Sequence, residues 1–195
     1  MLAIGVSEYQ RPDYRLGLPA KDAADFARAI ARQQGRLYAD VTTRVLLDAQ
    51  ARRADVQAGL RWLAEAGGRD DVVMLFIAGH GVNAGNGRYY FLPHDARHEA
   101  LAATAVAEDD IRQALRGVPG RAILFIDTCH AGNVLGSAGR GQRELARFVN
   151  DLASAENGVV VFASSAGRQV SEEDSAWGNG AFTRDCRRRV HDARH

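Results

Sequence analysis

The stretch that decides the fold is AILFIDTCHAG, residues 122–132. A continuous apolar run ends at Asp127, Cys129 follows two residues later, and a glycine-containing turn comes next. Continuous apolar runs are typical of strands in parallel sheets that are covered on both faces. Cys129 is therefore either a small buried residue at the end of a core strand or a nucleophile, and cysteine is among the residue types most often buried.

Four further apolar runs have the same strand-like character: Leu2–Val6, Thr43–Leu47, Val72–Ala78 and Val159–Ala163. Helical spacing of apolar residues predicts helices over residues 23–30 and 56–63, and shorter patterns predict helices over 110–115 and 144–152. A short extra strand, Arg88–Leu92, is expected in a hairpin after residues 83–87. Strands alternating with helices indicate an α/β fold with a mainly parallel central sheet flanked by helices.

The composition is that of an ordinary globular domain. Of 195 residues, 46% are hydrophobic and 25% are charged, and the net charge of +1 gives no reason to expect a nucleic acid or membrane partner. Two cysteines cannot form a disulfide framework, which favours a reducing, cytoplasmic setting. We expect one domain over residues 1–183 and a basic C-terminal tail without apolar periodicity over residues 184–195, as in a truncated chain.

Two of the predicted strands end in chemically interesting residues. The run Val72–Ala78 leads into Gly79-His80-Gly81, just as the later run leads into Cys129. Functional groups in open α/β sheets gather beyond the carboxyl ends of the strands, so neighbouring strands would place His80 beside Cys129. An imidazole there can take the thiol proton and later protonate the leaving amine, whereas the alternative is two core residues.

The two motifs resemble the active-site motifs of the caspase and metacaspase superfamily. His80 precedes Cys129 by 49 residues, close to the roughly 50-residue separation found in caspases. The similarity extends to the segments LAIGVSEY at 2–9, KDA at 21–23, YFLP at 90–93 and GAFT at 180–183. The pattern is similar to that of bacterial caspase-like proteins, which are nearer to metacaspases than to animal caspases. The resemblance implies the caspase-like (caspase-hemoglobinase) fold.

Carried over by resemblance, Cys129 is the nucleophile and His80 the general base and acid. The backbone N–H groups of Gly81 and Cys129 would hold the oxyanion. Asp22 matches the metacaspase position that lines the pocket for the residue before the cleaved bond, and Asp127 lies two residues before Cys129, where animal caspases carry a glutamine. Two carboxylates in one pocket favour an arginine side chain and repel an aspartate. Without the resemblance, the same two residues would be a helix N-terminal charge and a strand-end turn residue.

The resemblance also raises the question of calcium. Asp95, Asp109 and Asp110 fall near the positions of an acidic calcium site in metacaspases. Calcium takes six to eight oxygen ligands, so three carboxylates would need carbonyls and water as well. The alternative is that Asp109 and Asp110 are ordinary acidic residues at a helix N-terminus. Chemistry by a Cys–His pair requires no cofactor, and calcium is an additional candidate.

The predicted function is that of a cysteine endopeptidase that cleaves protein or peptide substrates after arginine or lysine. A catalytically idle caspase-fold module that binds partners is the main alternative, and an α/β hydrolase of small molecules is a third. The polar stretch Ser164–Gly180 is a candidate binding loop. The glycine-rich loop Ala131–Gln142, followed by Arg143, predicts self-cleavage after Arg140 or Arg143. The sequence does not define an oligomeric state.

Overall fold

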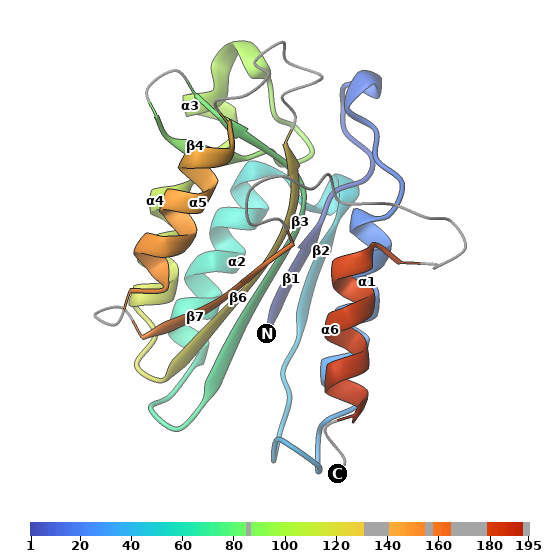
Figure 1. Ribbon diagram of the computed structural model, residues 1–195, viewed down its shortest axis with the longest axis vertical. Helices are drawn as coiled ribbons and strands as arrows, with labels where there is room; N and C mark the ends of the chain where they lie inside the picture. The colour runs from blue at the N-terminus through green and yellow to red at the C-terminus, as the bar shows by residue number, and fades with distance from the viewer. Residues whose placement is uncertain (85–86, 131–140, 155–157, 165–178, 193–195) are drawn as a thin grey trace.

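The protein has three layers, with a seven-stranded sheet between two layers of helices (Figure 1). The computed structural model describes residues 1–84, 87–130, 141–154, 158–164 and 179–192, without the side chains of residues 129–130, 141–144 and 187–192. Five strands run parallel: β2 (Arg44–Leu47), β1 (Leu2–Gly5), β3 (Val72–Asn83), β6 (Arg121–His130) and β7 (Val159–Ala163), in that spatial order. The predicted α/β fold with a mainly parallel sheet is confirmed.

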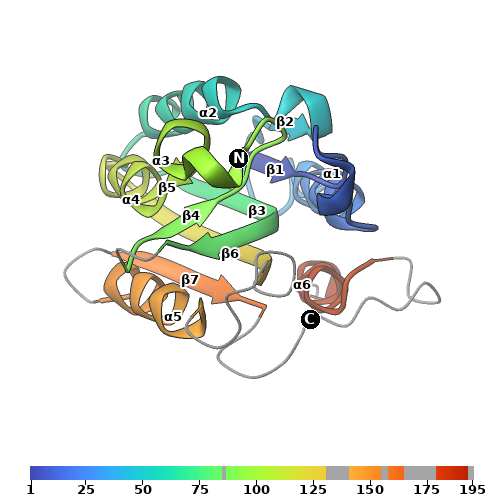
Figure 2. The ribbon, with the colours of Figure 1, turned by 90° about the horizontal axis from the view of Figure 1, so that it is seen from above.

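Helices cover both faces of the sheet (Figures 1 and 2). One face carries α1 (Pro19–Ala31) and α6 (Ala181–Asp192). The other face carries α2 (Arg53–Ala66), α4 (Glu108–Arg116) and α5 (Gly141–Leu152). Shorter elements are α3 (Leu101–Thr104) and three 3-10 turns at Pro12–Tyr14, Asp48–Gln50 and His98–Ala100.

The alternation of side chains along the strands divides the core into two parts. On β3, Leu75 and Ile77 pack into the cluster that contains the apolar residues of α2, α4 and α5. Phe76, between them, packs into the cluster that α1 completes, where the ring of Phe26 lies 4.9 Å from it. The apolar run of β3 is continuous because its side chains pack alternately against helices on one face of the sheet and on the other.

The strands β3 and β6 are longer than the apolar runs that predicted them. The parallel pairing of β3 with β6 continues to Gly81 and His130. On its other edge, β3 pairs antiparallel with β4 (Tyr89–Phe91), which in turn pairs with β5 (Val106–Ala107). The predicted hairpin is thus confirmed. These pairings keep Gly79 in the ladder, with a φ of 146° that favours glycine.

The predicted frayed tail is wrong for residues 184–192, because α6 runs from Ala181 to Asp192 across the expected domain boundary at 183. Phe182 and Cys186 lie four residues apart on one side of α6 and pack against the cluster around α1. This apolar stripe is too narrow to stand out among the arginines that follow it in the sequence. Within the described residues, no helix is both long enough and apolar enough to cross a membrane.

Candidate active site

The carboxyl ends of β3 and β6 place His80 and Cys129 opposite each other. The strands pair residue by residue, with His80 facing Cys129 in the register and Ala78 facing Asp127. The prediction that these two strands are neighbours is therefore confirmed. The side chains of Cys129 and His130 lie outside the described part of the structure, so the placement of the thiol rests on its backbone position.

The imidazole of His80 is held in one tautomer. The side chain is buried, with an exposed fraction of 4%, and its Nε2 lies 2.9 Å from the carbonyl oxygen of Tyr14. A carbonyl oxygen only accepts, so Nε2 carries the proton and Nδ1 keeps a free lone pair. Among the described residues Nδ1 has no hydrogen-bond partner. Nδ1 is therefore the nitrogen that can take a proton from a neighbouring thiol.

The surroundings of His80 also favour its neutral form. Burial lowers the pKa of His80, and the hydrogen bond to the Tyr14 carbonyl opposes this effect only in part. The hydroxyl of Tyr9 accepts the backbone N–H of His80 at 2.9 Å, and the ring of Tyr9 lies 5.3 Å from the imidazole. An imidazole that is neutral, and that is held by the Tyr14 carbonyl and the Tyr9 ring, can act as a general base near neutral pH.

The glycines beside His80 make room for two tyrosines. A Cβ atom at Gly79 would lie 2.9 Å from the hydroxyl of Tyr9, and one at Gly81 would lie 2.5 Å from the hydroxyl of Tyr89. The Tyr89 hydroxyl donates to Oγ1 of Thr128 at 2.9 Å, and burial raises its pKa far above the ordinary value. Tyr89 thus contacts residues adjacent to both members of the candidate pair, whereas the sequence marked it only as part of the predicted strand Arg88–Leu92.

Asp22 and Asp127 are brought to one spot, as expected from the sequence. Asp22 lies on α1 with an exposed fraction of 2%, and Asp127 lies on β6 with 9%. A methyl group placed on Gly180 would lie 2.9 Å from Oδ2 of Asp22 and 3.6 Å from Oδ2 of Asp127. The two carboxylates therefore lie close together, and Asp127 is only two residues from Cys129 in the sequence. We call Asp22 and Asp127 the acidic corner of the site.

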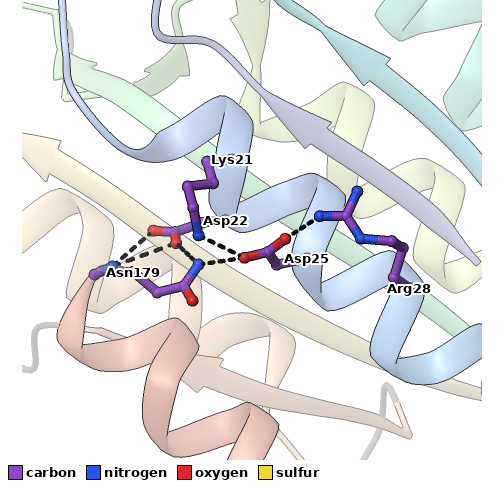
Figure 3. A network of polar contacts seen from close by, with 6 residues as sticks. Lys21, Asp22, Asp25, Arg28 and Asn179 are labelled. Atoms are coloured by element: carbon purple, nitrogen blue, oxygen red, sulfur yellow. Dashed lines mark hydrogen bonds and ion pairs between the residues drawn. The ribbon is translucent and has the colours of Figure 1, made fainter. Parts of the chain in front are cut away.

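The carboxylate of Asp22 is held by the start of α6 (Figure 3). It accepts the side-chain amide of Asn179 at 2.7 Å and the backbone N–H of Gly180 at 3.1 Å. Burial raises the pKa of Asp22, the hydrogen bonds from Asn179 and Gly180 lower it, and the charge of Asp127 raises it. Sequence reasoning missed Asn179, although it directly precedes the GAFT segment that resembles the family.

The three candidate calcium ligands each have a different partner. Asp95 accepts the backbone N–H of Arg53 at 2.9 Å, and Asp110 accepts the side-chain amide of Gln57 at 3.3 Å. Asp109 forms ion pairs with Arg88 and Arg112. The described residues contain no group of three His, Cys, Asp or Glu side chains that could hold a metal ion. Calcium binding stays a prediction.

Two predicted loops fall largely outside the described residues. Residues 131–140, with Arg140, and residues 165–178 are not described. Arg143 lies in α5, near its first residue. Self-cleavage and the role of the polar loop therefore remain predictions.

The model of the caspase domain family of peptidases (Peptidase C14) matches residues 1–191. The chain belongs to the caspase domain family. The crystal structure of protein GSU0716 from Geobacter sulfurreducens matches all of this chain and 82% of that one, with a TM-score of 0.69 and 21% identity, and supports the fold. No curated protein matches the sequence significantly. At the level of the family, the caspase domain is a cysteine peptidase domain with protein substrates.

Proposed function

We propose that this caspase domain is a cysteine endopeptidase that cleaves after arginine or lysine, with Cys129 as nucleophile and His80 as general base and acid. The observation that carries this proposal is the state of His80: protonated on Nε2 by its bond to Tyr14, with Nδ1 unpartnered among the described residues, on a strand in register with Cys129. A buried imidazole with one free nitrogen beside a cysteine is the arrangement that activates a thiol.

The reaction follows from these positions. Nδ1 of His80 takes the thiol proton, and the Cys129 sulfur attacks the carbonyl carbon of the scissile bond. The negative charge on the carbonyl oxygen is stabilised by the backbone N–H groups of Gly81 and Cys129. The imidazolium then gives its proton to the leaving amine. Water, deprotonated by the same imidazole, hydrolyses the thioester and restores the thiol.

The preference for a basic residue rests on Asp22 and Asp127. A guanidinium that enters the acidic corner relieves the repulsion between the two carboxylates and donates planar, bidentate hydrogen bonds to their oxygens. Lysine offers a point charge without the planar fork and should be cleaved less well than arginine. An aspartate side chain would be repelled.

The test is a panel of peptides that differ only in the residue before the cleaved bond: arginine, lysine, aspartate and citrulline, which has the shape of arginine without its charge. We expect cleavage in the order arginine, lysine, citrulline, with none after aspartate and none in Cys129→Ala. Asp22→Ala and Asp127→Ala should each reduce cleavage after arginine, while thermal unfolding shows a folded domain. Cleavage after aspartate alone would refute the pocket, and a folded protein that cleaves no peptide would support the idle-module alternative.

A further inference from the structure

The two residues that precede α6, Asn179 and Gly180, contact α1 through a network in which two carboxylates of α1 have different partners (Figure 3). Asp22 and Asp25 lie three residues apart on the same helix, and both accept the side-chain amide of Asn179, at 2.7 Å and 2.9 Å. Asn179 itself has an exposed fraction of 5%. A primary amide carries two N–H donors, so each donor is used by one carboxylate.

The charge of Asp25 is balanced, whereas that of Asp22 is not. Asp25 forms ion pairs with Lys21, at 2.7 Å, and with Arg28. Asp22 forms no ion pair with any described residue; the charge of Asp127 raises its pKa and that of Lys21, the smaller effect, lowers it. A buried carboxylate that lacks a cation depends on hydrogen bonds to stay ionised, and those bonds come from Asn179 and Gly180.

Gly180 has a second effect, through the side chain that it lacks. Its Cα lies where an added methyl group would approach both Oδ2 atoms of the acidic corner, at 2.9 Å for Asp22 and 3.6 Å for Asp127. The first of these distances is shorter than a carbon–oxygen contact allows, so any side chain at position 180 would occupy the space that the two carboxylates face. A glycine places no side chain in that space.

We propose that Asn179 and Gly180 are positioning residues of the arginine pocket: they hold the Asp22 carboxylate toward Asp127 and leave room for a guanidinium between them. The inference rests on the proposed function and extends it to the start of α6. The charged groups that act on Asp22 in the described structure are Asp127 from β6 and Lys21 from its own helix, while Asn179 and Gly180, just before α6, contribute neutral amides.

The first test compares Asn179→Ala with Asp25→Asn, which breaks the other half of the network and leaves Asp22 its amide. Asn179→Ala should raise KM for the arginine peptide about tenfold, the loss of about one charge-assisted hydrogen bond, and change kcat little. It should also move the acid limb of arginine cleavage to higher pH, because the pKa of Asp22 rises without the amide. Cleavage of the citrulline peptide should change less. Asp25→Asn should leave the acid limb in place.

The second test uses Gly180→Ala, so that the inference does not depend on one variant. Its added methyl should reduce kcat/KM about tenfold or more for the arginine peptide and for the citrulline peptide alike, because the two side chains have the same shape. Gly117→Ala, at the end of α4, is the matched control, because its methyl would meet no atom closer than 3.3 Å. Thermal unfolding of all four variants separates a loss of recognition from a loss of folding.

The outcomes separate this inference from the proposed function. If the wild-type protein shows no preference for arginine, both fail. If wild type prefers arginine and Asp22→Ala loses that preference, while Asn179→Ala keeps the KM and acid limb of wild type, only the inference fails. It also fails if Asp25→Asn reproduces the acid-limb shift, since the contact would then serve only to dock α6 on α1.

Discussion

The hydrogen bond between Tyr89 and Thr128 offers the sharpest quantitative test of how the site is built. Both side chains are essentially inaccessible to solvent, and their hydroxyl groups lie 2.9 Å apart. Tyr89→Phe removes the donor without changing the ring that stacks on Phe148 at 5.7 Å. A buried neutral hydrogen bond contributes about 1 kcal/mol net, and removing one partner so that the other is left unsatisfied costs about 1–3 kcal/mol in total.

We therefore expect Tyr89→Phe and Thr128→Val each to lower the free energy of unfolding by about 1–2 kcal/mol. The double variant should lose about 1 kcal/mol less than the sum of the two, because it leaves no orphaned hydroxyl. For a domain of this size, 1 kcal/mol corresponds to a shift in Tm of about 2–4 °C. Urea denaturation in a Cys129→Ala background, where the chain cannot cleave itself, measures all three values.

Tyr90→Phe is the matched control. Its hydroxyl has no hydrogen-bond partner in the described part of the chain, so the loss should stay within about 0.5 kcal/mol. If the single losses simply add in the double variant, the two hydroxyls do not interact, and Tyr89 does not support Thr128 through a hydrogen bond. Because Thr128 precedes Cys129, we also expect Tyr89→Phe in the active protein to lower kcat more than it raises KM.

Three further predictions concern the catalytic pair, pH and processing. Cys129→Ala and His80→Ala should each abolish nearly all turnover, and the double variant should be no worse in a peptide assay, since the two groups act as a unit. Burial lowers the pKa of His80, so on acidification the histidine of the unfolded chain is protonated before that of the folded chain. The free energy of unfolding should therefore decrease as the pH drops below about 6.5, and it should decrease less steeply in His80→Gln. Urea titrations at several pH values measure both. Intact mass spectrometry should detect a cut after Arg140 or Arg143 in active protein and none in Cys129→Ala, and equal uncut masses where peptides are cleaved would contradict it.

Calcium has a separate expectation. Asp95, Asp109 and Asp110 already bind a backbone amide, arginines and a glutamine. We therefore expect turnover to persist in chelator, since the chemistry of the pair requires no cofactor. A loss of activity that millimolar calcium restores would show instead that these carboxylates bind the ion.

The sequence by itself determined the layers of the fold and the position of the candidate pair. Continuous apolar runs can be satisfied only by a sheet covered on both faces, so β1, β2, β3, β6 and β7 were all predicted. Since parallel strands end at the same edge, the histidine and cysteine that follow two of these runs were expected side by side, and the register pairs His80 with Cys129. Local sequence patterns are enough to predict these features, because each apolar run and the residues that follow it belong to one strand.

Only the tertiary structure decided what surrounds the pair. The Tyr14 carbonyl that fixes the tautomer of His80 is a backbone group, which no residue type reveals. Asn179 reaches Asp22 across more than 150 positions of sequence, and α6 packs against the cluster around α1 through Phe182 and Cys186. Such contacts depend on which elements pack together in three dimensions. The sequence pattern of one segment does not predict which distant segments will contact it.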